Sequence, residues 1–215
     1  MYFGCLNKSD YICNYNKFVY TMIKFHDVKT TDRELVQSYT LCSDRQNCDL
    51  SFANIISWRF LYNTQIAEVD GFLVFRFYIG HHLAYMAPVW KGEWNELMSE
   101  PFAKVVRQMR DDSITLGHPF LMLGVCTNMV EILERIFPDT FYIKPDRDYF
   151  DYIYTREKLA TLAGKKLQSK RNHCHRFRKT YPNYEYRPLT KDMIPECLAV
   201  EANWRTVTKE DNNEE

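Results

Sequence analysis

The residues with the clearest chemical potential are the lysines and arginines of one short stretch. Between Arg156 and Lys179 the sequence holds nine Lys or Arg and a single acid, Glu157, although the formal net charge of the whole chain is zero. Arginine holds an oxyanion as a bidentate fork and lysine as a point charge, so this excess of cations predicts an anionic partner. The candidate anion-contacting residues are Lys165, Lys166, Lys170, Arg171, Arg176 and Arg178.

The same stretch has the spacing of a helix from Lys165 to Tyr181. Gly164 precedes this segment and Pro182 follows it, and both residue types commonly border helices. The apolar residues form one narrow stripe, made of Leu167, Cys174, Phe177 and Tyr181. Such a stripe docks a helix against a domain but leaves most of its circumference in water. Two interpretations stay open: an anion-binding helix, and a solvated helix that only connects two parts of the chain.

A second polar group lies in the segment Pro145–Tyr154. The alternation of its side chains predicts a strand from Asp148 to Tyr154. Asp146, Arg147 and Asp148 are interpreted either as a structural ion-pair cluster or as a source of a general acid or base, and with Tyr152 they mark a candidate cleft. The sequence assigns no catalytic residue.

No metal site and no cofactor site are predicted. His173, Cys174 and His175 are adjacent, so on a helix their side chains point in different directions. The seven cysteines include no CxxC pair, and reduced thiols are expected. Gly124 stands alone between a predicted strand and a predicted helix, where it is interpreted as a turn residue rather than part of a phosphate-binding loop. An acetyl-coenzyme A site in this domain is therefore disfavoured.

Length and composition indicate a globular protein with one substantial core. The chain has 215 residues, of which 46% are hydrophobic and 15% aromatic. Its most apolar segment, Phe72 to Ile79, is as short as a strand and contains Arg76, so it does not read as a membrane span. The first residues lack the pattern of a signal peptide. We expect a cytoplasmic location.

The order of predicted elements indicates a mixed α/β fold, in which helices cover a mixed sheet. Asp70-Gly71 is a dipeptide that two-residue hairpin turns prefer, so it should join the first two strands. Strands are predicted at Gln65–Val69, Phe72–Tyr78, His82–Met86, Phe120–Val125 and Asp148–Tyr154. Helices are predicted at Leu50–Leu61, at Glu93–Arg110 with a kink or restart at Pro101, and from Thr127 to Pro138.

After the basic helix the pattern begins again, with a strand at Tyr184–Arg187 and a helix at Lys191–Trp204. One strand and one helix cannot bury a core, so either they pack back on the first domain or the chain stops within a second domain. We expect the second case, with self-association through Ile194, Leu198 and Trp204. The predicted organisation is an N-terminal extension (1–21), a first domain (22–163), a basic linking helix (164–182) and the start of a second domain (183–215). Residues 1–21 show no hydrophobic periodicity and are expected to be dispensable.

Several ordered motifs resemble one known family. They are NCDLSFANIISWRFLYNT, EVDGFLVFRF, LAYMAPV, MLGVCTNM, PDRDYFDYIYTREKLATLAGKKLQSKRNH and RFRKTYPNYEYRPLT. Between about Met22 and about Trp204 the chain resembles the bacterial phosphatidylglycerol lysyltransferase C-terminal domain family. The resemblance implies two GNAT-like acyltransferase domains in tandem, related to the Fem and multiple peptide resistance transferases, with only the first complete here.

The resemblance also implies a function. Such enzymes move an aminoacyl group from aminoacyl-tRNA to a lipid or cell-wall acceptor, so tRNA phosphates or lipid headgroups become the expected partners of the basic helix. This chain alone is not expected to catalyse transfer. Two alternatives stay open: a non-catalytic module that binds nucleic acid or an anionic surface, and an acyl-coenzyme A transferase whose cofactor site lies in the missing second domain.

Overall fold

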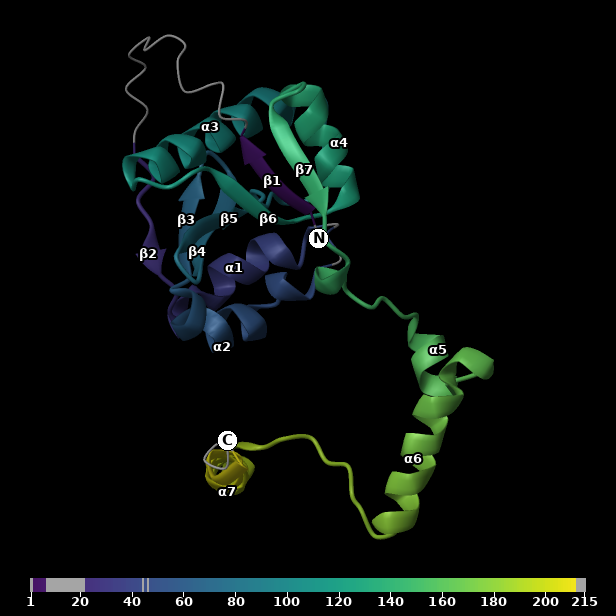
Figure 1. The fold of residues 1–215 in the computed structure, drawn as a ribbon. Coiled ribbons are helices and arrows are strands. Elements are labelled where there is room, and N and C mark those ends of the chain that lie inside the picture. The colour runs from purple at the N-terminus through teal and green to yellow at the C-terminus, as the bar shows by residue number, and fades with distance from the viewer. Residues whose placement is uncertain (1, 7–21, 44, 46, 212–215) are drawn as a thin grey trace. The chain divides into compact units, whose positions relative to one another are not determined.

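The computed structural model describes residues 2–6, 22–43, 45 and 47–211 (Figure 1). The chain divides into two compact units, Met1–Tyr152 and Ile153–Glu215. The division lies before the boundary between residues 163 and 164 that the sequence indicates.

The first unit is built on a mixed sheet, which confirms the predicted α/β class. Among the described residues the sheet has seven strands in the order β2-β3-β4-β5-β6-β1-β7. The pairing of β5 with β6 is parallel, and every other neighbouring pair is antiparallel. The strands are β1 Tyr2–Leu6, β2 His26–Asp27, β3 Gln65–Val69, β4 Phe72–Ile79, β5 His82–Met86, β6 Leu121–Val125 and β7 Phe141–Pro145.

The predicted hairpin between β3 and β4 is confirmed. Asp70 and Gly71 join the two strands with φ angles of 48° and 82°, and Val69 pairs with Phe72 across the turn. Both turn positions thus have the positive φ that a two-residue hairpin requires. The predicted third strand is also present, as β5, and it pairs antiparallel with β4. The predicted antiparallel meander of β3, β4 and β5 is therefore confirmed.

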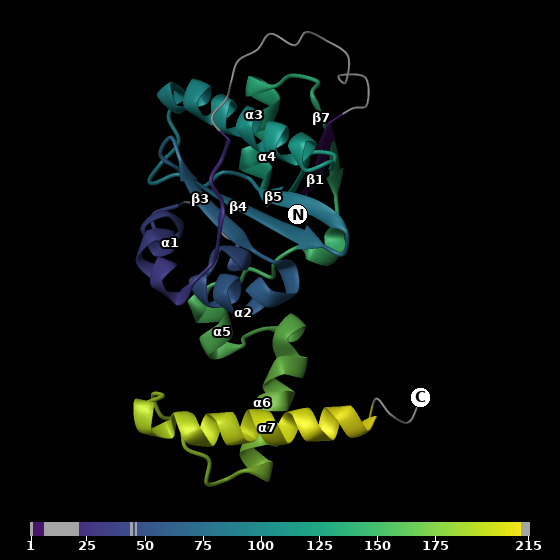
Figure 2. The same cartoon turned by 90° about the vertical axis from the view of Figure 1, so that its left-hand side faces the viewer.

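Helices cover both faces of this sheet (Figures 1 and 2). Helices α1 (Arg33–Thr40) and α2 (Phe52–Tyr62) lie on one face, and α3 (Ser99–Thr115) and α4 (Thr127–Ile136) lie on the other. Side chains of β4 alternate between the two layers: Leu73 and Phe75 pack with α1 and α2, whereas Phe72 and Val74 pack with α3 and α4. A strand buried on both faces explains why the sequence of β4 is almost continuously apolar.

Strand β1 argues against the expectation that residues 1–21 are dispensable. Tyr2–Leu6 lies between β6 and β7 and is antiparallel to both. Its backbone closes the gap between two strands that would otherwise be separated. Residues 7–21 lie outside the described residues.

The predicted strand at Asp148–Tyr154 is wrong. A strand forms earlier, as β7, and Arg147–Tyr149 adopts a 3-10 turn instead. The Asp146 carboxylate accepts a hydrogen bond from the backbone N–H of Asp148 at 3.1 Å. Such local side-chain bonds compete with strand pairing, and they explain why the alternating pattern did not produce a strand here.

The described part of the second unit is helical. It contains α5 (Arg156–Thr161), α6 (Gln168–Thr180) and α7 (Ile194–Asp211). The predicted strand at Tyr184–Arg187 is wrong, since none of its residues belongs to a strand and Tyr186 is 94% exposed. A strand needs a neighbour, and the described residues of this unit supply none. None of these described residues is buried, as expected of a unit too small to enclose a core.

Candidate functional site

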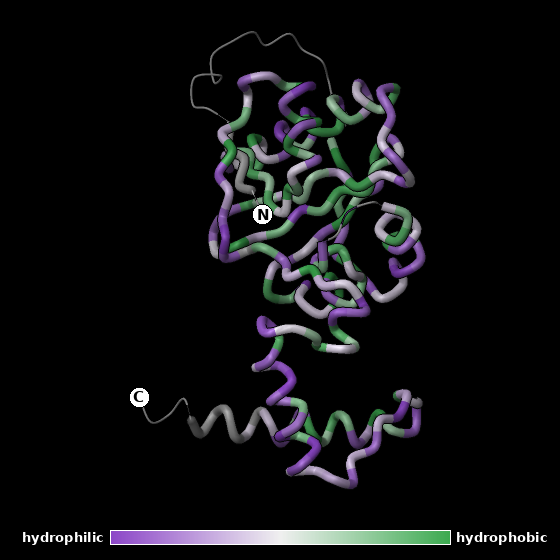
Figure 3. Tube along the Cα trace, turned by 90° about the vertical axis from the view of Figure 1, so that its right-hand side faces the viewer, coloured by the Kyte–Doolittle hydropathy of each residue, from purple (hydrophilic) through white to green (hydrophobic). Residues whose placement is uncertain are grey.

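The basic helix begins and ends close to where the sequence indicated. Thr155 caps the preceding α5 by accepting a hydrogen bond from the Lys158 N–H, and α5 ends at Leu162 in the left-handed conformation. Gly164, with φ 89°, turns the chain into a short 3-10 segment, Lys165–Leu167, and α6 follows directly. The tube of Figure 3 is largely hydrophilic along α6. Every residue of α6 except the partly buried Arg171 is exposed, so the helix presents its polar side chains to solvent, as both interpretations of the sequence require.

One of the six predicted anion-contacting residues has a structural task. Arg171 is partly buried, and its Nη1 donates to the carbonyl oxygens of Leu162 and Gly164, the latter at 2.8 Å. The Leu162 carbonyl lies at the end of α5, where helical acceptors lack an intrahelical donor, and Gly164 is the N-cap of the 3-10 segment that follows. Arg171 thus fixes the turn between α5 and α6.

The other five cations are exposed. Arg176 lies 3.4 Å from a ring nitrogen of His173, and the Lys170 ammonium lies 5.9 Å from the centre of the Tyr154 ring. Among the described residues Lys165, Lys166 and Arg178 make no hydrogen bond or ion pair through their side chains. The side chains available to an anion are therefore Lys165, Lys166, Lys170, Arg176 and Arg178, and their binding role stays a prediction.

These cations do not share one face of the helix. Arg178 follows Lys170 by eight residues, about 80° around the helix, whereas Arg176 follows Lys170 by six residues and points to the other side, about 120° away. A flat anionic surface would contact only some of them. A ligand whose phosphates lie on more than one side of α6 would engage more, and a folded nucleic acid offers that arrangement.

Exposed aromatic rings gather at the carboxyl end of α6. The ring centre of Phe177 lies 5.1 Å from that of Tyr181 and 5.2 Å from that of Tyr184. All three side chains are about half exposed. Aromatic rings beside cations form the kind of surface on which unpaired bases stack while their phosphates are neutralised.

The residues of the candidate cleft do not form an ion-pair cluster in the part of the chain that the structure describes. Asp146 caps the turn that follows β7, and the Arg147 guanidinium lies 5.2 Å from the centre of the Phe150 ring. Asp148 and Tyr152 are exposed, Tyr152 at 81%. These four residues belong to the first unit and the basic helix to the second. A catalytic role for them stays a prediction.

The same segment holds a contact that the sequence did not indicate. The Asp151 carboxylate accepts hydrogen bonds from the Cys48 thiol at 3.1 Å and from the Cys48 backbone N–H at 3.2 Å. The bond from the thiol to Asp151, together with burial, raises the pKa of Cys48 to about 11. Burial and the neighbouring Asp151 charge also raise the pKa of Asp49. Cys48 is thus held as a neutral thiol, which disfavours it as a nucleophile.

Replacing Asp151 with asparagine is expected to make Cys48 more reactive. Without the carboxylate the pKa of the thiol falls toward its ordinary value, so more thiolate is present at pH 8 and alkylation by iodoacetamide should accelerate severalfold. Mass spectrometry of the modified peptides measures the rate, with the exposed Cys42 as an internal reference. Asp146→Asn, which removes a carboxylate of the same segment, should leave the rate at Cys48 unchanged. Equal rates in the native protein and Asp151→Asn would contradict this account.

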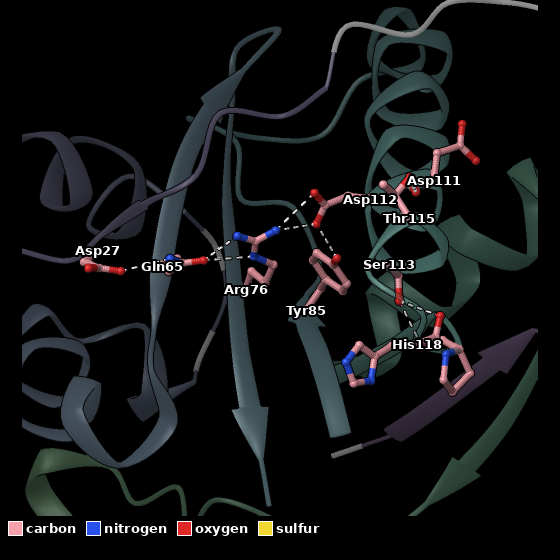
Figure 4. Close-up of polar contacts among 10 residues, drawn as sticks. Asp27, Gln65, Arg76, Tyr85, Asp111, Asp112, Ser113, Thr115 and His118 are labelled. Atoms are coloured by element: carbon pink, nitrogen blue, oxygen red, sulfur yellow. Dashed lines mark hydrogen bonds and ion pairs between the residues drawn. The ribbon is translucent and has the colours of Figure 1, made fainter. Parts of the chain in front are cut away.

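A buried polar network ties the sheet to α3 in the first unit (Figure 4). Arg76 Nη1 donates to both carboxylate oxygens of Asp112, at 2.8 and 3.1 Å, and the Tyr85 hydroxyl donates to the same carboxylate at 2.6 Å. Arg76 Nε also donates to Gln65 Oε1 at 3.0 Å. Burial and the bond to Asp112 raise the pKa of Tyr85, which keeps the hydroxyl a neutral donor.

Every strong donor in this network has a partner, so we interpret it as structural. In the sequence alone, Arg76 indicates only that the apolar segment of β4 is not a membrane span. An arginine inside an otherwise apolar strand was the available signal, since a buried guanidinium requires a buried acceptor.

Two further searches of the described residues add no site. No three His, Cys, Asp or Glu side chains in the described ranges are arranged to hold a metal ion. None of the described helices combines the length and the apolarity of a bilayer span.

The comparisons with known proteins identify the family. A family model described as "Phosphatidylglycerol lysyltransferase, C-terminal" matches residues 42–215. The chain belongs to this family. The match confirms the resemblance and includes α6, its aromatic rings and the contact between Cys48 and Asp151, whereas β1 and α1 precede it.

A solved structure shares both sequence and fold with this lysyltransferase-family chain. It is described as a conserved protein of unknown function from Bacteroides thetaiotaomicron VPI-5482, is 51% identical and superposes with a TM-score of 0.75. The alignment covers 89% of this chain and 62% of that protein, so the chain spans less than two thirds of its relative. No curated protein matches the chain.

Proposed function

We propose that this chain belongs to an aminoacyl-tRNA-dependent transferase and that α6 contributes to binding the tRNA. The observation that carries the proposal is the exposure of five cations on and before α6, together with the exposed rings of Phe177, Tyr181 and Tyr184 at its carboxyl end. Cations position phosphates without reading sequence, and the rings offer stacking surfaces for unpaired bases. Membership of a lysyltransferase family supports a lysyl or related aminoacyl group as the transferred group.

The proposal includes two GNAT-like domains in tandem, as the resemblance to the lysyltransferase family implies. The mixed sheet with helices on both faces is consistent with an acyltransferase-like first domain. The acceptor would be a lipid or a cell-wall group. A non-catalytic binding module on the same fold remains the alternative, and the anionic-lipid and transfer measurements below separate the two.

The test is tRNA binding as a function of salt. The variant Lys165→Gln, Lys166→Gln, Lys170→Gln and Arg178→Gln removes four cations and keeps Arg171, whose guanidinium fixes the α5–α6 turn. The logarithm of the association constant should fall linearly with the logarithm of salt concentration, and the slope should shrink by about 0.7 to 0.9 for each cation that no longer neutralises a phosphate. At up to about 1 kcal/mol for each exposed cation, binding should weaken by about 3 kcal/mol.

The matched control removes the same charge from the first unit. Substituting glutamine at four exposed lysines, Lys24, Lys29, Lys91 and Lys144, should leave the salt slope close to that of the native chain. Equal slopes in the α6 variant and this control would overturn the binding role of α6.

Vesicles and a transfer assay separate the two function classes. Charged tRNA is incubated with the protein and phosphatidylglycerol vesicles, and aminoacylated lipid is sought by mass spectrometry. Transfer that depends on the α6 cations supports the enzyme. The same assay is run with this chain and with a longer protein of the relative's length. If both bind tRNA or vesicles and neither transfers an aminoacyl group, the binding module is favoured.

A further inference from the structure

The first unit contains a cavity that the function proposed above does not use. It has a volume of about 640 Å³ and lies where α1, the loop after it and the amino end of α2 meet. Small-molecule sites in proteins commonly enclose about 300 to 1,000 Å³, so this volume suits a metabolite-sized ligand. The described lining residues are Thr30, Arg33, Gln37, Thr40, Leu41, Arg45, Asn47, Leu50, Ser51, Phe52 and Ala53.

The lining is cationic. Among the described residues it includes two arginines and no carboxylate. Arg45 donates to the Ala87 carbonyl at 2.7 Å and to the Pro88 carbonyl, and its guanidinium lies 4.7 Å from the centre of the Trp90 ring. These contacts hold the Arg45 guanidinium against Ala87, Pro88 and Trp90, which are not among the described lining residues, so Arg45 is a fixed part of the cavity wall rather than an open contact for a ligand.

Arg33 provides the cation that can contact a ligand. Its Nε donates to Gln37 Oε1 at 3.2 Å, one helical turn away in α1. No carboxylate of the described residues forms an ion pair with it. The two terminal nitrogens of its guanidinium therefore remain for a bidentate contact with an oxyanion.

Hydroxyl groups and apolar side chains complete the lining. Ser51 is the N-cap of α2, yet its side chain makes no capping hydrogen bond, so its hydroxyl is available to a ligand. Thr30 and Thr40 add two more hydroxyls, and Leu41 and Phe52 add apolar surface. A few polar groups set among apolar ones are typical of sites that orient a small ligand.

We propose that this cavity binds a small molecule through an oxyanion group, either a phosphate or a carboxylate, with Arg33 as the charged contact and Arg45 as a fixed part of the wall. The inference rests on the cavity of the first unit alone and is independent of tRNA binding by α6. The hydroxyl of Ser51 would donate to the same oxyanion, and the apolar part of the ligand would contact Phe52.

Titration of the full chain with simple oxyanions tests the proposal. Inorganic phosphate and malonate are added separately at constant ionic strength, and amide shifts are followed by ¹H–¹⁵N NMR. We expect saturable shifts at Gln37 and Ser51 for at least one of the two anions. Saturation by phosphate only assigns a phosphate ligand, and saturation by malonate only assigns a carboxylate ligand.

Substitution of Arg33 separates the cavity from general anion binding. Arg33→Gln should raise the dissociation constant about tenfold or more, because it removes the charge and the bidentate donor of the cavity. Arg33→Lys keeps the positive charge but cannot make a bidentate contact, so its affinity for the anion should lie between those of the native chain and Arg33→Gln. Arg107→Gln on α3, an arginine outside the cavity, should bind as the native chain does. No saturable shift at Gln37 or Ser51 with either anion, or equal affinity in Arg33→Gln, would overturn the proposal.

Discussion

Asp112→Ala is expected to lower the free energy of unfolding by about 3 to 5 kcal/mol. The Asp112 side chain is 6% exposed and is the acceptor for both Arg76 and Tyr85. Removing it leaves a guanidinium that is 16% exposed without its counter-ion and a buried hydroxyl without its acceptor. Breaking a buried pair costs this much because the remaining charge stays desolvated.

The neighbouring Asp111 provides a matched control. Its side chain is 38% exposed and pairs with Arg110 at 3.0 Å on the surface of α3, so Asp111→Ala should cost about 1 kcal/mol or less. Urea unfolding followed by circular dichroism measures both variants. A cost for Asp112→Ala no larger than that for Asp111→Ala would show that Arg76 finds water or another acceptor.

A double substitution tests the physical cause. Arg76→Met combined with Asp112→Leu removes both charges and leaves apolar side chains of similar size. Because no unpaired charge remains buried, the double variant should recover part of the stability that Asp112→Ala loses. Greater stability of the double variant than of Asp112→Leu alone, which fills the same space but keeps Arg76, would attribute the loss to the desolvated guanidinium rather than to a cavity at position 112.

Local sequence patterns correctly predicted the elements that depend on residues close together in the chain. The Asp70-Gly71 turn, the apolar run of β4 and the helical spacing of α2 all appeared where expected, since each depends on residues close together in the chain. The start of α3 at Ser99 also agrees with the predicted restart near Pro101, which lies in the first turn, where proline is tolerated.

The failures share one cause, which is that long-range pairing cannot be inferred from local patterns. Tyr2–Leu6 pairs with strands more than a hundred residues away, and its pattern gave no signal of this. Conversely, the alternating segment at Asp148–Tyr154 looks like a strand, but a side-chain cap and the bond from Cys48 to Asp151 hold it in another conformation. Alternation indicates compatibility with a sheet and does not supply a partner strand.

The candidate site was predicted in part. Charge density located α6 correctly, yet it could not distinguish Arg171, which binds two carbonyl groups of its own chain, from Lys165 and Arg178, whose side chains have no polar partner among the described residues. The cavity beside Arg33 and Arg45 was missed. Its lining comes from two helices and the loop between them, and the sequence gave no periodic signal for α1.

A chain that begins at Met22 is expected to melt about 10 °C or more below the full chain, contrary to the expectation from sequence. It lacks β1, which pairs with β7 at five positions and with β6 at three. Loss of an inner strand leaves two rows of backbone groups without partners and parts β7 from the sheet. In a protein of this size each kcal/mol lost lowers the melting temperature by about 2 to 4 °C, so a loss of several kcal/mol gives the expected shift.

Gly4→Pro in the full chain separates loss of the strand from loss of the other N-terminal residues. Proline in an inner strand removes a ladder hydrogen bond and is poorly tolerated there, so this single change should reproduce much of the destabilisation. A proline at Lys24, outside every described strand, serves as the control and should change the melting temperature by less. Differential scanning calorimetry measures all three variants. Unchanged melting of both the shortened chain and Gly4→Pro would show that the space between β6 and β7 is closed without β1, by another segment or by direct pairing of the two strands.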